Sequence, residues 1–344
     1  MQILNMTMML GQAAGGNSIW LPTLLSPPVL FFVLGLVAVA IRSDLALPDS
    51  VKKALSLYLL FSIGFKGGAM LRESGLTSEG MAAMGIAAVL SAATPLWLFP
   101  ILRKRLGSAT AGGVAATYGS VSAVTFMAAV TMLRDRGVDL GGHMVAAMVI
   151  MEFPALIIGV LLARALADNE TGKPSDAPRT SLATAMRASA TNGPIVLLVG
   201  SMLIGALTTD DGRQLTAPMW SELFTGVLCF YLLDLGLIAG KGVRSVLAAG
   251  WLPVLVGVLF PPINAMIALG LSRSSGLTIG DTFLMMAMAA SASYIAAPAA
   301  LRIALPEAKA SVYVPMALTL TFPVNITIGL PVYWVLAQRF AMGA

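Results

Sequence analysis

Charged residues, cysteine and histidine are all scarce in this 344-residue chain. Charged side chains make up 11% of the residues, while 58% are hydrophobic and the mean hydropathy is +0.87. So few charges leave too little polar surface for a soluble globule of this length, and we predict a membrane protein. The single cysteine, Cys229, excludes a disulfide framework. The single histidine, His143, has no cysteines or carboxylates at ligand spacing, so no metal site is expected.

The chain also lacks the motifs of several enzyme and pump classes. No glycine-rich phosphate loop ends in Lys-Ser or Lys-Thr, so nothing supports ATP-driven transport by this chain. The run Gly119-Ser120-Val121-Ser122 is not a nucleophile elbow, and Asp234 has no companion aspartate at similar depth, which argues against an intramembrane protease. The net charge of +5 is spread over short loops, which does not favour nucleic-acid binding. We therefore do not expect an enzyme.

Runs of about twenty apolar residues predict ten transmembrane helices. No basic segment precedes the first run, so a cleaved signal is not expected. Most Lys and Arg residues lie in the loops after the odd-numbered runs, which predicts that both termini lie outside the cytoplasm. The ten runs cover residues 27–41, 51–71, 80–102, 109–133, 141–164, 193–208, 219–239, 246–271, 280–304 and 311–340.

One long polar segment divides the chain into two halves. Residues 167–192 are rich in Pro, Gly, Ser and charged residues, which is typical of a linker. Five predicted helices lie before it, in residues 1–166, and five lie after it, in residues 193–344. Because five is an odd number, the second half enters the membrane from the opposite side. The sequence therefore predicts an all-α membrane protein built as an inverted 5+5 repeat with a cytoplasmic linker.

Short sequences recur in the same order in both halves. Coincidence in an alanine-rich and leucine-rich sequence could produce one such match, but four in one order favour a repeat. The first two matches are Tyr58-Leu59-Leu60 with Tyr231-Leu232-Leu233 and Leu98-Phe99-Pro100 with Leu259-Phe260-Pro261. The third pairs Ser120-Val121-Ser122 with Ser291-Ala292-Ser293, and the fourth pairs Phe153-Pro154 with Phe322-Pro323.

The two serine motifs predict interruptions of the fourth and ninth helices inside the membrane. Gly and Ser can also simply allow close helix packing, and a single motif would favour that interpretation. Where a helix is interrupted in the bilayer, its freed backbone groups must line a cavity or be buried in protein. The next half-helix then presents N–H groups and a partial positive charge, to which serine hydroxyls add donors. We therefore expect the interruptions to meet near the midplane and bind a small anion without Arg or Lys.

Several polar residues inside the predicted helices are candidates for cation binding or ion pairing. Glu152 precedes Phe-Pro in the fifth helix and is predicted to bind a cation, to carry a proton, or to be a structural partner of Lys66. Asp234 and Lys66 occupy neighbouring positions in the second helix of each half, which suggests that they pair. Asn325 offers an amide to the same region. His143 begins the fifth helix and is expected at the membrane interface.

Seven short runs of the chain are typical of one known family: Leu47-Pro48-Asp49, Gly64 to Arg72, Gly119 to Ser122, Phe153 to Leu156, Ala289 to Ser293, Pro298 to Arg302 and Leu305-Pro306. With these runs the chain resembles the sodium-dependent bicarbonate transporter superfamily of the SbtA type, over about residues 27–340. The resemblance implies a homotrimer in a bacterial inner membrane, in which a mobile core domain moves as an elevator against a gate domain, each built from both halves. It also implies bicarbonate bound between two crossing broken helices, with sodium symport into the cell.

The resemblance also assigns site residues position by position. Glu152 stands where better-known relatives have aspartate, which keeps the charge. No cofactor is implied other than Na⁺ as coupling ion. The residues predicted to bind the anion are Gly119, Ser120, Ser122, Thr125, Ser291 and Ser293. Those predicted to bind the coupling cation are Glu152, Ser122, Ser293 and Asn325.

The sequence departs from the family at both serine motifs. Ser-Gly-Ser becomes Ser122-Ala123-Val124, and an acidic residue becomes Tyr294, while Ser-Gly-Pro-Pro becomes residues 296–299, Ala-Ala-Pro-Ala. These changes make the expected site less polar and remove a carboxylate. Alternatives therefore include a transporter of another small organic anion, coupled to sodium or protons. A further alternative is a receptor or scaffold whose linker binds a cytoplasmic PII-like regulator.

Overall fold

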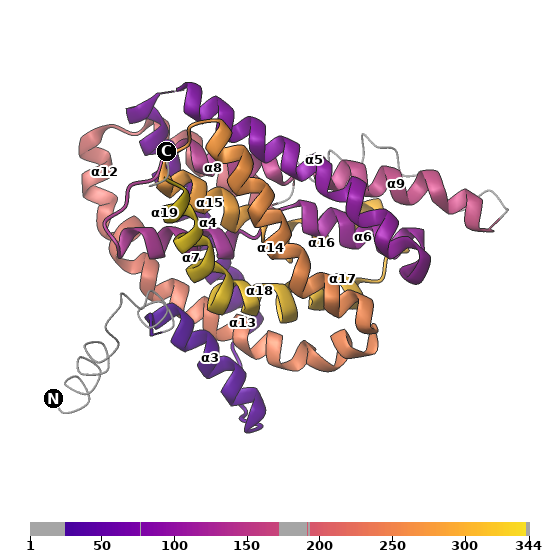
Figure 1. Cartoon of the computed structure of the whole chain (residues 1–344). Helices are drawn as coiled ribbons and strands as arrows, with labels where there is room; N and C mark the ends of the chain where they lie inside the picture. The colour runs from indigo at the N-terminus through magenta and orange to yellow at the C-terminus, as the bar shows by residue number, and fades with distance from the viewer. Residues whose placement is uncertain (1–24, 76, 172–190, 192, 342–344) are drawn as a thin grey trace.

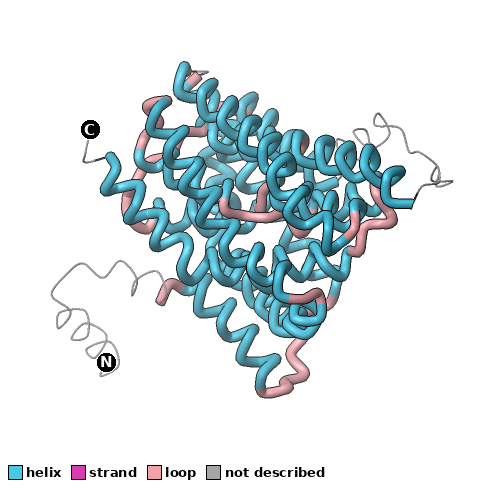
Figure 2. Tube along the Cα trace, turned by 45° about the vertical axis from the view of Figure 1, so that its right-hand side comes forward, coloured by secondary structure: helices cyan, strands magenta, loops and turns pink. Residues whose placement is uncertain are grey.

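The structure is a computed structural model that describes residues 25–75, 77–171, 191 and 193–341 (Figure 1). Within those ranges the chain is all-helical and forms no strand (Figure 2). Seven helices are long and apolar enough to span a membrane. Their bounds are Asp49–Glu73, Ser78–Leu106, Ser108–Arg134, His143–Leu166, Asp210–Ala248, Trp251–Ser274 and Ala310–Arg339.

The other three predicted spans fall on apolar helices that are shorter than a full membrane crossing. These helices are α3 (Pro27–Ala40), α11 (Gly193–Leu207) and α15 (Ile279–Ala289). The coarse prediction of an all-α membrane protein is therefore supported, and seven of the ten predicted spans reach spanning length. Large hydrophobic side chains exposed on the outer helices, such as Val89, Leu203 and Ile263, would face lipid.

The remaining elements follow the chain in order. α9 (Pro154–Thr171) continues past Ala167 into the predicted linker. Residues 172–190 and 192 of that linker lie outside the described part of the chain. The first half contains α4 (Asp49–Ser74), α5 (Ser78–Leu106), α6 (Ser108–Gly119), α7 (Ala123–Arg134), α8 (His143–Met151) and α9 (Pro154–Thr171). The second contains α12 (Asp210–Ala217), η1 (Pro218–Glu222), α13 (Leu223–Ala248), α14 (Trp251–Ser274), α16 (Ala296–Ala304), α17 (Ala310–Pro315), η2 (Met316–Thr321), α18 (Phe322–Val324), η3 (Asn325–Gly329) and α19 (Leu330–Ala341).

The helices begin and end where local chemistry dictates. At the start of α5 the Thr77 hydroxyl accepts a hydrogen bond from the Gly80 N–H (3.1 Å), which caps the helix. Three basic residues in its last turn, from Arg103 to Arg105, complement the negative end of the helix dipole. The helix stops at Gly107, whose φ of 76° suits glycine.

In the centre of the molecule, nearly every residue of α6 and α15 is buried, so these two helices form the inner layer.

Two helix pairs cross so closely that their backbones touch. A β-carbon on Gly35 of α3 would lie 2.3 Å from the Leu233 carbonyl oxygen of α13, and one on Gly236 would lie 2.2 Å from the Phe32 oxygen. The pair of α4 and α11 crosses in the same way. There, a β-carbon on Gly205 would lie 2.0 Å from the Phe65 oxygen. Small residues allow such backbone contact in membrane helices.

This packing predicts that Gly205→Ala lowers the melting temperature of the detergent-solubilised protein by several degrees. The added methyl group meets backbone rather than a movable side chain, and overpacking of this kind costs roughly 1–3 kcal/mol. Gly200→Ala is the matched control, because it lies on the same helix and its β-carbon would meet nothing within 4 Å. Equal melting temperatures for the two variants would contradict the described crossing of α4 and α11.

One sequence prediction is wrong. Asp234 does not pair with Lys66: its carboxylate lies 3.7 Å from the Lys52 ammonium, which reaches it from the start of α4. His143, predicted at the membrane interface, is buried within the protein. It is 4% exposed, and its Nε2 lies 3.1 Å from the Asp281 carboxylate of α15, so it joins the two halves of the chain.

Candidate anion and cation site

The two serine motifs lie in non-helical segments that contact each other. Residues 120–122 separate α6 from α7, and residues 290–295 separate α15 from α16. The Ser122 N–H donates a hydrogen bond to the Ser291 hydroxyl (2.8 Å), and the Ser293 N–H donates to the Thr117 carbonyl oxygen (2.9 Å). Backbone groups freed by one interruption are thus satisfied by the other, as burial away from water requires.

The four serines of these segments differ in what their hydroxyl groups do. Ser122 caps α7 by accepting a hydrogen bond from the Thr125 N–H (3.1 Å), and Ser293 accepts one from the Ala297 N–H (3.1 Å). A serine hydroxyl has one proton and two lone pairs, so each of these two residues keeps its proton for another acceptor. Ser291 instead donates its proton to the Met288 carbonyl oxygen (2.7 Å), and Ser120 donates to Glu152.

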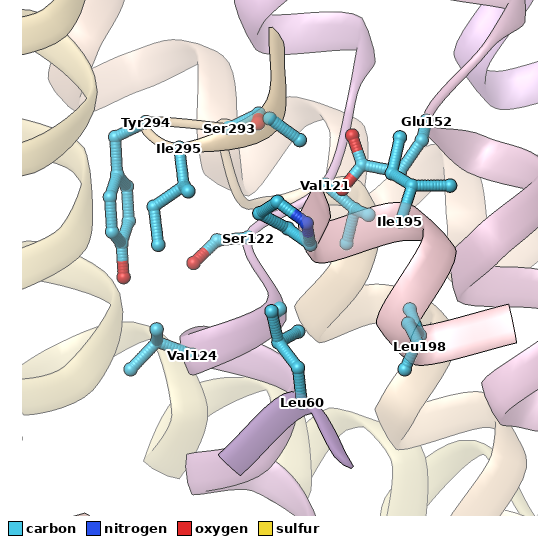
Figure 3. Close-up of a pocket in the computed structure, with 13 residues that line it drawn as sticks. Leu60, Val121, Ser122, Val124, Glu152, Ile195, Leu198, Ser293, Tyr294 and Ile295 are labelled. Carbon is cyan, nitrogen blue, oxygen red and sulfur yellow. The ribbon is translucent and has the colours of Figure 1, made fainter. Parts of the chain in front are cut away.

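A small pocket lies where the two segments meet helices α4 and α11 (Figure 3). We call it the central pocket. Its volume is about 30 Å³, enough for about two water molecules. Ser122 and Ser293 both line it, so the two serines whose protons are not donated to Met288 or Glu152 are those that face it. The full lining is Leu60, Val121, Ser122, Ala123, Val124, Glu152, Pro194, Ile195, Leu198, Ser293, Tyr294, Ile295 and Ala296.

Glu152 supplies the one carboxylate of the central pocket lining. It sits in the short break between α8 and α9, and Ser91 of α5 holds that break in place. The Ser91 hydroxyl donates to the Met151 carbonyl oxygen (2.7 Å) and accepts from the Ala155 N–H (3.1 Å). The Glu152 carboxylate accepts a hydrogen bond from Ser120 (2.5 Å) and makes no ion pair with the described Lys, Arg or His residues. A carboxylate in such apolar surroundings requires a cation or a proton.

Three other predicted site residues lie next to the central pocket without lining it. Gly119 is a packing residue, because a β-carbon there would lie 2.6 Å from the Ala155 β-carbon of α9. Thr125 contributes its N–H to the Ser122 cap. The Asn325 amide donates to the Ala290 carbonyl oxygen (2.6 Å) and accepts from the Tyr333 hydroxyl (3.1 Å). Asn325 therefore holds the second interruption in place, and its amide group already forms these two hydrogen bonds.

Tyr294 and the first amides of α7 complete the lining. The Tyr294 hydroxyl is buried and makes no hydrogen bond of normal geometry in the described part of the chain, while the Ser122 side chain points toward it (Figure 3). Its ring packs edge-on against Phe322, with centroids 5.7 Å apart. The N–H groups of Ala123 and Val124, both lining residues, make no backbone hydrogen bond with the described residues, as expected at a helix N-terminus.

The whole arrangement falls within one match to a known family. The family model of the Na⁺-dependent bicarbonate transporter superfamily matches residues 27–338, nearly the full chain. The chain belongs to this superfamily. The match includes both interruptions, Glu152 and the helices around the central pocket, so it confirms the resemblance inferred from the sequence. As a member of this superfamily, the chain is an integral membrane protein of a transporter class. No curated protein matches the chain.

Proposed function

We propose that the chain is a secondary active transporter that takes up a small anion, with bicarbonate as substrate and Na⁺ as coupling ion. The observation that carries this proposal is the meeting of two helix interruptions around one pocket. Serine hydroxyls from both interruptions line that pocket together with a carboxylate that makes no ion pair with the described residues. The family match supports the same ions.

The anion would bind through hydrogen-bond donors alone. Ser122 and Ser293 each offer one proton, and the amides of Ala123 and Val124 stand at the positive end of the α7 dipole. Bicarbonate has three oxygen atoms that can accept such bonds. At about 30 Å³ the central pocket has little room to spare, so side chains around it would have to move slightly as the anion enters.

Glu152 would couple the cation to the anion. Its negative charge repels an anion in the same apolar pocket, where charges interact strongly. Na⁺ is a hard cation that prefers oxygen ligands, and the carboxylate provides them. When Na⁺ binds, the repulsion is removed and the anion binds more tightly. By linkage, the anion then tightens Na⁺ binding by the same factor. A proton on Glu152 would remove the repulsion equally well.

The arrangement of helices supports an inverted repeat, and we propose that the protein works by an elevator movement. The first helix of each half crosses the second helix of the other half at a glycine contact, α3 with α13 and α11 with α4. On this basis the halves are residues 1–166 and 193–344, joined by a cytoplasmic linker at 167–192. We assign these four helices to a gate domain that forms the homotrimer. The core domain then carries both interruptions, and the central pocket lies where the two domains meet.

Uptake of labelled bicarbonate into proteoliposomes tests this function. An inward Na⁺ gradient should drive accumulation at pH values that are equal on both sides, and a pH gradient without Na⁺ should not. Accumulation driven only by the pH gradient would favour proton coupling through Glu152. If acetate or another monocarboxylate is accumulated and bicarbonate is not, the substrate assignment is wrong. If no anion accumulates under either gradient, the chain is a receptor or scaffold rather than a transporter.

A further inference from the structure

A second feature of the molecule is a lysine held rigidly in the middle of α4. Lys66 is followed by two glycines that contact neighbouring helices closely. A β-carbon on Gly67 would lie 2.4 Å from Val145 of α8, and one on Gly68 would lie 1.8 Å from the Met202 carbonyl oxygen of α11. These contacts fix α4 on two sides. The direction in which Lys66 leaves the helix is therefore set by the backbone, and α4 cannot rotate to bring its ammonium to solvent.

The Lys66 ammonium is buried without a partner. Its nitrogen atom is shielded from solvent and forms no hydrogen bond with any described residue. The ion pairs among those residues include neither Lys66 nor Arg134. The Phe224 ring of α13 lies 5.3 Å away, a cation–π contact that offsets only part of the cost of burying a charge. Burying a charge without a counter-charge costs so much free energy that we expect an anion from outside the chain to compensate it.

The Lys66 side chain lines a cavity of about 460 Å³ between α4, α12, η1 and the end of α7, which we call the Lys66 cavity. Its ammonium nitrogen is covered, so the lysine side chain would have to shift for a ligand in the cavity to reach it. Arg134, from the end of α7, reaches the same cavity, and the two positive charges repel each other. The cavity shares no lining residue with the central pocket. Its nearest lining residue on α4, Phe65, is five positions beyond Leu60, or about 7.5 Å along the helix axis.

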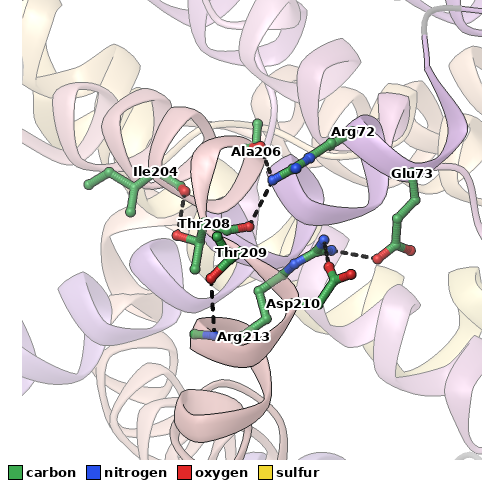
Figure 4. Close-up of polar contacts among 9 residues, drawn as sticks. Arg72, Glu73, Ile204, Ala206, Thr208, Thr209, Asp210 and Arg213 are labelled. Atoms are coloured by element: carbon green, nitrogen blue, oxygen red, sulfur yellow. Dashed lines mark hydrogen bonds and ion pairs between the residues drawn. The ribbon is translucent and has the colours of Figure 1, made fainter.

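The acidic residues of the Lys66 cavity are already occupied by a third cation. Arg213 of α12 forms ion pairs with Glu73 (2.5 Å) and with Asp210 (Figure 4). The neighbouring Arg72 points elsewhere and donates to carbonyl oxygens at the C-terminal end of α11, those of Ala206 (3.3 Å) and Thr208 (3.0 Å). The three cations and two acids of the lining leave the cavity with a net positive charge, and Lys66 and Arg134 are the two lining cations that form an ion pair with neither acid.

We propose that the Lys66 cavity is a second anion site, which binds a small soluble oxyanion between the Lys66 ammonium and the Arg134 guanidinium. A charged donor on each side suits an oxyanion such as bicarbonate or sulfate. The phosphate of a lipid headgroup has the same chemistry. Gln214 and Ser221 add neutral hydrogen-bonding groups to the wall beside the Arg213 ion pairs, and phosphatidylglycerol serves as the probe for the lipid source. The site is independent of the proposed transport reaction.

The test compares the melting temperatures of the full-length protein in detergent, with sodium sulfate added at constant ionic strength. Sulfate should stabilise the parent protein with a saturable dose dependence. Lys66→Met and Arg134→Gln should weaken this effect about tenfold or more, because each removes one charged donor. Lys53→Met is the matched control on the same helix, since Lys53 is exposed and outside the cavity; it should leave the effect unchanged.

Stability without added anion provides a second readout. Lys66→Met should melt at the same temperature as the parent or higher, because it removes an unpaired buried charge while keeping the length of the side chain. Lower stability would mean that Lys66 has a structural role, and this would overturn the proposal. It would also be overturned if sulfate stabilised Lys66→Met and the parent equally, or if only phosphatidylglycerol stabilised the parent. Ser122→Ala, a central-pocket variant, should keep the sulfate effect, which separates the failure of this site from that of the transport site.

Discussion

Glu152→Gln is expected to abolish sodium-driven uptake while leaving the protein folded. The glutamine oxygen can still accept the hydrogen bond that Ser120 donates to the carboxylate, so the packing around the break between α8 and α9 is kept. The negative charge is lost, and with it the group that would hold the cation. Removing one partner of a buried ion pair costs about 3 kcal/mol or more, which corresponds to at least about a hundredfold loss of cation affinity.

Initial rates of labelled bicarbonate uptake under an inward Na⁺ gradient measure this effect. Glu152→Asp should keep part of the activity because it keeps the charge. Glu79→Gln, which changes an exposed glutamate in the first turn of α5, should behave like the parent. If Glu152→Gln retained the parent's sodium dependence, the carboxylate would have no part in coupling, and the cation would have to bind elsewhere.

Ser122→Ala and Ser293→Ala should each weaken bicarbonate binding by about ten- to a hundredfold. Each substitution removes a hydroxyl group that lines the central pocket and whose proton is not used in the bond to the backbone N–H. A hydrogen bond to a charged group contributes roughly 1.5–3 kcal/mol, from which the expected loss of affinity follows. Each substitution also removes the hydroxyl oxygen that accepts a hydrogen bond from a backbone N–H near the start of a helix. We therefore expect the free energy of unfolding to fall by about 1 kcal/mol as well.

Ser291→Ala separates binding from stability. The Ser291 hydroxyl accepts from the Ser122 N–H and donates to the Met288 carbonyl oxygen, and it does not line the central pocket. This variant should therefore lose as much stability as the other two, with a much smaller change in bicarbonate affinity. Equal affinity losses in all three variants would indicate that the serines act only by holding the two interruptions together.

The part of the site that repeats in the sequence could be predicted from the sequence. Both serine motifs and Glu152 could be recognised because a helix interruption or a carboxylate inside the membrane costs free energy. A residue that brings such a cost is therefore expected to have a function. The roles of single hydroxyl groups could not be predicted. Ser120 and Ser122 are two positions apart in the same motif, and only the exact end of α6 and start of α7 decides which one faces the central pocket.

Ion pairing between distant helices was the least predictable feature. Asp234 and Lys66 occupy similar positions within the second helix of each half, but α4 and α13 run in opposite directions, so the two residues lie at different levels. Lys66 is about 21 Å along α4 from Lys52 and lies beside Phe224, which is ten residues before Asp234. Lys52 reaches Asp234 instead. The contribution of α11 to the pocket wall was also missed, because Ile195 and Leu198 are ordinary apolar residues of a short helix.

The most direct test is equilibrium binding of bicarbonate to the purified protein, measured with and without Na⁺ in the parent and in Glu152→Gln. If one pocket binds both ions, Na⁺ should lower the Kd for bicarbonate by about tenfold or more in the parent, within the usual range of coupling between sites. In Glu152→Gln the Kd should be the same with and without Na⁺. An equally large effect of Na⁺ in both proteins would contradict a shared site at the meeting of the two helix interruptions.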